Sequence, residues 1–192
     1  MKFRILQYLP NTLTWVRVGL IPVMVICIAL IPKLGGLLAA VVFLIAALTD
    51  FFDGLLARSY RLTSRFGEFF DPVADKLLVA AALLLLLAVA EPPWPRWILA
   101  LLAGVIIVRE LAVSAMREWS AREGYSDVTA VSWIGKAKTA SQLAALPILL
   151  ASISLPEWRQ LAHAGGALLI VAALLGLASM VVYLQSLLRA MD

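Results

Sequence analysis

Four aspartates are spaced so that each pair shares one face of a helix. Asp50 and Asp53 are three residues apart and Asp71 and Asp75 are four apart, the separations that bring helical side chains together. Two adjacent antiparallel helices can therefore direct four carboxylates at one volume. Such charges repel unless a cation offsets them, and Mg²⁺ or Mn²⁺ suits oxygen ligands at a site shared with phosphates. The spacing predicts a divalent metal site.

The alternative is that these carboxylates pair with nearby cations in a solvated loop. Five acidic residues lie between positions 50 and 75, the four aspartates and Glu68. The solvated-loop interpretation is favoured for Glu68 alone. The four aspartates fall instead within otherwise apolar helix ends, where charge is costly.

Small residues and a cation follow the first aspartate pair. Gly54 and Ala57 remove side-chain bulk, so that a ligand can approach the helix backbone. Close packing between helices would explain the same residues. Arg58 offers a planar fork for a phosphate oxygen.

A second group of charged residues is basic: Arg109, Arg117, Lys136 and Lys138. We expect them at the cytoplasmic ends of two apolar spans, on the same side of the membrane as the carboxylates. A basic pocket there suits a small anionic co-substrate. Plain cytoplasmic enrichment of cations is the alternative. Arg17, inside the first apolar span, has the same two interpretations.

The elements that must position these residues are membrane spans. Of 192 residues, 63% are hydrophobic and 15% charged, and the mean hydropathy is +0.97. A soluble domain would be about 45–50% apolar, so disorder, nucleic-acid-binding tails and disulfide scaffolds are excluded. The chain has a single cysteine, Cys27. We interpret the net charge of +4 as membrane orientation and contact with anionic lipid rather than nucleic-acid binding.

We expect an all-α polytopic membrane protein with a single domain over residues 1–192. Its six transmembrane helices are predicted at 14–31, 37–57, 69–90, 97–116, 139–155 and 166–185. A short amphipathic helix before Pro10 is expected to lie on the membrane surface.

The orientation follows from the basic residues. Three of the sixteen, Lys33, Arg96 and Arg159, flank the turns on one side, and the other thirteen lie on the opposite side. By the positive-inside rule, both termini and the carboxylates are cytoplasmic, at the cell's inner membrane.

The aspartates belong to a longer pattern, Asp50-x2-Asp53-Gly54-x2-Ala57-Arg58-x8-Gly67-x3-Asp71-x3-Asp75. It resembles the signature of the CDP-alcohol phosphatidyltransferases without a gap. The resemblance implies two metal ions held by the four aspartates, Asp75 as the catalytic base, and a homodimer. It implies that the residues binding CDP-diacylglycerol are Thr14, Asp50, Gly54, Ala57, Arg58, Ser64 and Gly67.

A narrower resemblance is carried by the segments 11–17, 70–76, 109–119 and 133–139. They are similar to the family members whose acceptor is sn-glycerol 3-phosphate. The implied reaction transfers the phosphatidyl group of CDP-diacylglycerol to that acceptor and releases CMP. The acceptor would then be held by Arg17, Arg109, Arg117, Lys136 and Lys138.

Other functions remain open at this point. The same signature serves family members that make cardiolipin or phosphatidylinositol phosphate from other acceptors. A membrane prenyltransferase also gathers aspartates around Mg²⁺, but it lacks the Gly-x2-Ala-Arg insert. A cation transporter would need its carboxylates near the middle of the membrane, whereas here they lie at the ends of spans.

Overall fold

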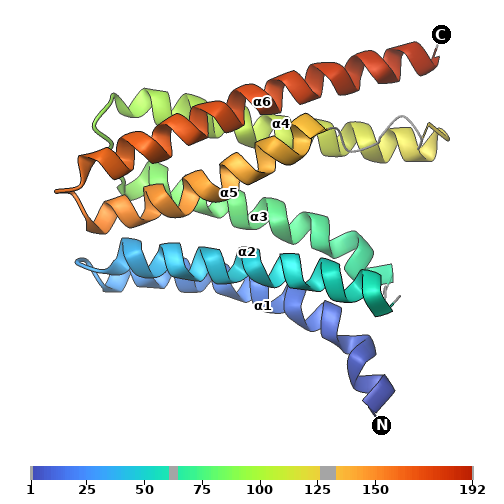
Figure 1. Ribbon diagram of the computed structural model, residues 1–192, viewed down its shortest axis with the longest axis horizontal. Coiled ribbons are helices and arrows are strands. Elements are labelled where there is room, and N and C mark those ends of the chain that lie inside the picture. Colours follow the sequence, from blue (N-terminus) through green and yellow to red (C-terminus); the bar gives the residue numbers. More distant parts are fainter. Residues whose placement is uncertain (1, 61–64, 126–132, 192) are drawn as a thin grey trace. The chain divides into compact units, whose positions relative to one another are not determined.

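The computed structural model describes the backbone of residues 2–60, 65–125 and 133–191, and the side chains of residues 14–49, 70–125 and 133–191. In these residues the regular structure is six α-helices without a strand, which confirms the all-α prediction (Figure 1). The helices are α1 (Lys2–Leu30), α2 (Gly35–Tyr60), α3 (Arg65–Val89), α4 (Arg96–Arg122), α5 (Trp133–Ser154) and α6 (Arg159–Met191).

Three helical segments are long and apolar enough to cross a membrane, within the part of the chain whose side chains are described. They are Phe70–Val89, Arg96–Arg122 and Arg159–Met191. Two shorter apolar segments, Thr14–Leu30 and Gly35–Thr49, belong to α1 and α2. The chain is therefore a helical membrane protein, and the count of six spans stays a prediction.

The N-terminal segment is not a separate helix. Residues 2–13 are continuous with the rest of α1, and in Figure 1 the dark blue N-terminal part of α1 bends away from the remainder. A proline inside a helix removes one backbone hydrogen bond and commonly produces such a bend. Pro10 supplies that cause.

Two helices extend well beyond the spans that hydropathy predicts. At 1.5 Å per residue, the 33 residues of α6 are about 50 Å long, against a hydrocarbon layer of about 30 Å. The 27 residues of α4 continue to Arg122, six residues past the expected end. Arg109 therefore lies midway along α4, about 20 Å from Arg96, and its expected place at the cytoplasmic end of a membrane span stays a prediction.

By their contacts, the residues form two compact units. The first contains residues 1–91 and 146–161, and in it α1, α2 and α3 all pack against one another. Its core includes the fully buried side chains of Met24, Phe43 and Leu83. In this unit the C-terminal part of α5 packs closely on α2. Gly36 of α2 lies directly against the backbone carbonyl of Leu150 of α5, so a Cβ atom at position 36 would clash.

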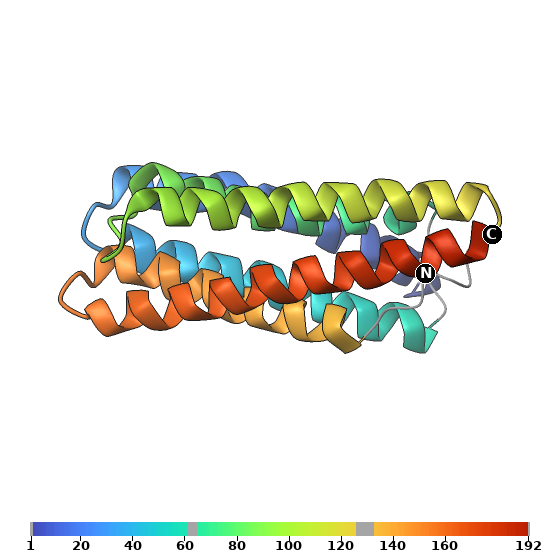
Figure 2. The same ribbon diagram turned by 90° about the horizontal axis from the view of Figure 1, so that it is seen from above.

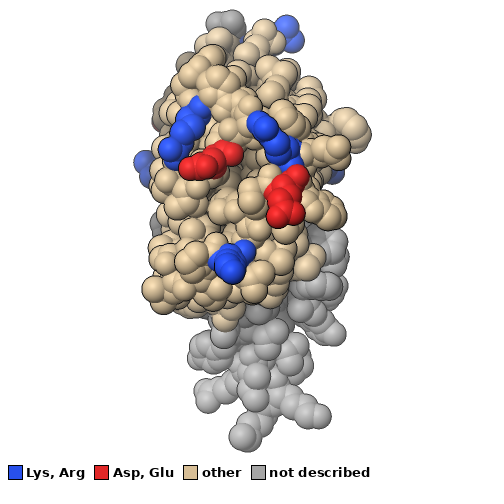
Figure 3. Space-filling model, turned by 90° about the vertical axis from the view of Figure 1, so that its left-hand side faces the viewer, with Lys and Arg blue, Asp and Glu red and all other residues tan. Residues whose placement is uncertain are grey.

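One end of the first unit carries both the α1–α2 and the α5–α6 connections. Lys33, Glu157 and Arg159 are exposed there, and Figure 3 shows few charged side chains on a largely uncharged surface. The sequence analysis expects few cations on this side of the membrane, and the orientation itself stays a prediction.

The second unit contains residues 92–145 and 162–192. Within it α4 and α6 run alongside each other (Figure 2), and Ser120 and Tyr183 join them by a hydrogen bond between their hydroxyls of 3.1 Å. The face of α6 buried in this unit consists largely of small residues, among them Gly166 and Gly176. Near the start of α6, the Trp94 indole occupies the space at Gly166 where a side chain would lie.

Candidate functional site

Two of the predicted metal ligands are held by side chains of α1. The Thr14 hydroxyl donates a hydrogen bond to Asp71, and Arg17 NH1 donates to Asp75 Oδ1 at 2.6 Å. Thr14 and Arg17 are fully buried, whereas the Asp75 side chain is 47% exposed. Residues three apart on α1 therefore match carboxylates four apart on α3, and both carboxylates lie on the face of α3 that meets α1.

Aromatic and small residues fix this alignment of α1 with α3. The rings of Trp15 and Phe70 pack with their centroids 5.3 Å apart, immediately beside the two polar pairs. Ala74, which precedes Asp75, is fully buried, so α3 is closely packed at this point. The carboxylate positions are thus set by packing as well as by hydrogen bonds.

The other predicted ligands are on α2. Asp50 and Asp53 belong to this helix, which packs on α3 within the same unit, but their side chains lie outside those described. The same holds for Ala57 and Arg58, while Gly54 and Gly67 are placed by backbone alone and Ser64 lies outside the described residues. Among the described side chains no three potential metal ligands come together.

The residues present nevertheless fit a hard divalent cation. Asp71 and Asp75 lie one turn apart on α3, and each has its carboxylate oriented by a donor on α1. The helix that carries Asp50 and Asp53 is adjacent. The atoms available to bind a metal are all carboxylate oxygens, which Mg²⁺ and Mn²⁺ prefer.

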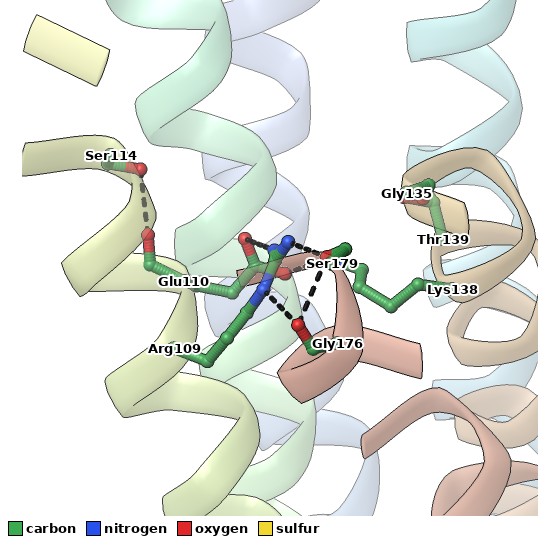
Figure 4. A network of polar contacts seen from close by, with 8 residues as sticks. All are labelled: Arg109, Glu110, Ser114, Gly135, Lys138, Thr139, Gly176 and Ser179. Carbon is green, nitrogen blue, oxygen red and sulfur yellow. Dashed lines mark hydrogen bonds and ion pairs between the residues drawn. The ribbon is translucent and has the colours of Figure 1, made fainter. Parts of the chain in front are cut away.

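A second polar network lies within the second unit (Figure 4). Arg109 donates from Nε to the Gly176 carbonyl oxygen at 3.1 Å and from NH2 to the Ser179 hydroxyl. Its NH1 group is 3.5 Å from Glu110 Oε2. Lys138 Nζ forms an ion pair with Glu110 Oε1. The network thus joins α4, α5 and α6 through two cations and one carboxylate.

The charged side chains of this network are largely shielded from solvent. The exposed fractions are 9% for Lys138, 10% for Arg109 and 19% for Glu110. Together with Gln142, Gly176 and apolar residues of α4 and α6, they line a narrow, partly open recess that is too small to admit a water molecule. Two shielded cations beside a single carboxylate are suited to attract an anion.

The four predicted basic residues therefore divide into two kinds. Arg109 and Lys138 are buried together, whereas Lys136 is exposed on α5. Arg117 is also exposed, and its guanidinium lies 5.9 Å from the centroid of the Tyr183 ring. This cation–π contact holds Arg117 beside α6, where it stays accessible to water.

The sequence analysis missed Glu110 as a member of the site. It was noted only within the segment 109–119, although it is the one acidic residue of the expected fourth span at 97–116. A carboxylate at membrane depth requires a partner, and that requirement was the available signal. Gly176 and Ser179 gave no comparable signal, because small residues are common in membrane helices.

Comparison with known proteins identifies the family. The CDP-alcohol phosphatidyltransferase family model matches residues 7–184. The chain belongs to this family. The CDP-alcohol phosphatidyltransferases are generally metal-dependent, in agreement with the aspartates described above.

Named relatives of this CDP-alcohol phosphatidyltransferase are similar along nearly their whole length. Proteins from Salmonella choleraesuis (strain SC-B67) and Escherichia coli (strain K12) are each 44% identical over 181 residues, which is 93% of either chain. Both are named CDP-diacylglycerol--glycerol-3-phosphate 3-phosphatidyltransferase.

Proposed function

We propose that the protein transfers the phosphatidyl group of CDP-diacylglycerol to sn-glycerol 3-phosphate, giving phosphatidylglycerophosphate and CMP. The observation that carries the proposal is the pairing of Thr14 with Asp71 and of Arg17 with Asp75. These two pairings place two carboxylates of the family pattern side by side. The relatives of the chain are named for this activity.

The metal site consists of Asp50, Asp53, Asp71 and Asp75, holding two ions of Mg²⁺ or Mn²⁺. When bound, such ions neutralise the diphosphate and the charge that develops on the departing CMP. The residues assigned to CDP-diacylglycerol are Thr14, Asp50, Gly54, Ala57, Arg58, Ser64 and Gly67. In this set Arg58 donates to a phosphate oxygen, and the two small residues beside it admit the nucleotide to the backbone.

Asp75 acts as the base. Its carboxylate is 47% exposed, so an acceptor hydroxyl can reach it, and Arg17 fixes one of its oxygens. Asp75 takes the hydroxyl proton while the hydroxyl oxygen attacks the phosphorus attached to diacylglycerol. The bond from that phosphorus to the CMP oxygen breaks, and CMP leaves with the electron pair. Because positioning and electrostatics dominate phosphoryl transfer, the protein needs no covalent intermediate.

The acceptor's phosphate is held by cations, with Lys138 and Arg109 as the buried pair and Arg117 and Lys136 as exposed contributors. The sequence analysis also assigns Arg17 to the acceptor. Its buried contact with Asp75 indicates instead that Arg17 holds that carboxylate in place.

Lys138→Gln should raise the KM for glycerol 3-phosphate by about ten- to a hundredfold. A hydrogen bond to an ionised group contributes about 1.5–3 kcal/mol, and KM follows affinity when chemistry is slow relative to substrate release. The KM for CDP-diacylglycerol should stay within about twofold. Lys33→Gln, at an exposed cation of the α1–α2 connection, is the control. An equal rise in both constants would remove Lys138 from the acceptor site.

The choice of acceptor is tested by CMP release from CDP-diacylglycerol with a panel of alcohols. The panel contains glycerol 3-phosphate, inositol phosphate, serine and phosphatidylglycerol. The proposal requires release with glycerol 3-phosphate well above the others. Preferential release with phosphatidylglycerol would make the protein a cardiolipin synthase, and preference for inositol phosphate would make it a phosphatidylinositol-phosphate synthase.

The proposed setting is the inner membrane, with the termini and the active site cytoplasmic and the protein assembled as a homodimer. In a Cys27→Ala background, single cysteines at Pro93 and at Glu123 flank α4 at its two ends. We expect a membrane-impermeant maleimide to label the cysteine at position 93 in intact cells and the one at position 123 only after lysis. Labelling of both from outside would contradict this orientation.

A further inference from the structure

Glu110 lies between the two buried cations of the acceptor site. One oxygen of its carboxylate pairs with Lys138 Nζ on α5, and the other lies 3.5 Å from Arg109 NH1 on its own helix. The ion pair with Lys138 joins residues 28 positions apart. Glu110 is therefore the link between α4 and the cation that α5 contributes.

The two cations differ in what else holds them. Arg109 is also fixed by the Gly176 carbonyl and the Ser179 hydroxyl of α6, so its guanidinium is oriented without Glu110. Among the described residues, the Lys138 ammonium has its ion pair with Glu110. A lysine has a flexible four-carbon stem, and the position of its charge consequently depends on that carboxylate.

The charges also require a carboxylate at this place. Two cations that are about nine-tenths buried repel each other in a medium of low dielectric constant, and a buried charge without a counterion is costly. One carboxylate between them reduces the net charge of the group to +1. The group thus keeps an attraction for an anion, while the carboxylate offsets the repulsion between the two cations before the anion arrives.

We propose that Glu110 is a positioning residue, which holds the Lys138 ammonium in place to receive the phosphate of the acceptor. The proposal rests on the function proposed above and adds a residue that acts on the acceptor only through Lys138. Its carboxylate does not itself contact the acceptor, because two anions would repel.

The first test measures steady-state CMP release by Glu110→Gln. We expect the KM for glycerol 3-phosphate to rise about tenfold, the effect of misplacing one charge-assisted hydrogen bond, with kcat and the KM for CDP-diacylglycerol within about twofold. Glu118→Gln is the matched control, since Glu118 pairs with Arg122 on the same helix but both side chains are exposed. Glu110→Asp keeps the charge, and we expect it to restore part of the affinity.

A double-mutant cycle separates positioning from a general structural role. In a Lys138→Gln background, Glu110 has no lysine to hold and leaves a carboxylate beside the phosphate. Adding Glu110→Gln there should leave the KM for glycerol 3-phosphate unchanged or lower it. An equal rise in both backgrounds, or a KM for Glu110→Gln alone below that of the unmodified protein, would overturn the proposal.

A readout that does not use the acceptor distinguishes this proposal from the proposed function. Acylation of Lys138 by an amine-reactive reagent, followed by mass spectrometry, should be faster in Glu110→Gln than in the unmodified protein or Glu118→Gln. Unchanged labelling would refute the positioning role whatever the acceptor. Absence of CMP release by the unmodified protein with glycerol 3-phosphate would refute the proposed function alone. If Glu110→Gln fails to fold, Glu110→Asp must show the same directions of change.

Discussion

Asp71→Asn and Asp75→Asn should each abolish CMP release by a protein that still folds and inserts into the membrane. Asparagine keeps the shape of aspartate and an oxygen that can accept the hydrogen bond from Thr14 or Arg17. What each substitution removes is a negative charge from the four carboxylates to which we assign both metal binding and proton removal. The measurement is CMP release from purified protein, with folding checked by monodisperse elution in detergent.

The two variants should differ when the metal concentration is raised. Excess Mg²⁺ or Mn²⁺ should partly rescue Asp71→Asn, because a weakened metal site can be filled by mass action. It should not rescue Asp75→Asn, which has also lost the base. Glu91→Gln, at an exposed carboxylate of the α3–α4 connection, is the control and should keep full activity. Near-normal turnover by Asp75→Asn would remove Asp75 from the mechanism.

Arg17→Met should lower kcat by at least tenfold and leave the KM for glycerol 3-phosphate within about twofold. The Arg17 guanidinium donates to Asp75 Oδ1 at 2.6 Å, so its loss frees a carboxylate whose position matters for the chemical step. Breaking a fully buried ion pair lowers the free energy of unfolding by about 3–5 kcal/mol. We expect a smaller loss here, because Asp75 is half exposed and stays hydrated.

The division of the effect between the two constants decides the role of Arg17. A rise in the KM for the acceptor with unchanged kcat would return Arg17 to the acceptor site, as the sequence alone suggested. Arg17→Lys is the companion variant, which keeps the charge but not the planar fork of donors. We expect an intermediate kcat for it.

Hydropathy predicted the helices well and their ends poorly. The apolar stretches and the Pro- and Gly-rich turns located all six helices, because both signals are local. The expected span at 97–116 stopped where polar residues begin, yet α4 continues to Arg122. Polar residues end an apolar stretch without ending a helix, and a pair such as Glu118 with Arg122 supports the helix in water.

The site was predictable where its residues repeat along one helix, and not where they meet across helices. The separation of Asp71 from Asp75 correctly placed both on one face of α3. Their partners on α1 lie 57 and 58 residues away, and no local sequence pattern predicts such pairs. Arg17 was accordingly assigned to the acceptor from its charge and the family resemblance. Glu110 was missed for the same reason, because its partner Lys138 is on another helix.

The ion pair between Arg17 and Asp75 also constrains the order in which the protein can be assembled in the membrane. Arg17 lies three residues into the apolar segment Thr14–Leu30, and Asp75 is synthesised 58 residues later. At about 5–20 residues per second, a ribosome needs about 3 to 12 seconds for that interval. Throughout it, the first helix carries a cation that still lacks its carboxylate partner, and an unpaired charge within an apolar segment is costly. We therefore expect α1 to reach its final packing only after α3 has left the ribosome.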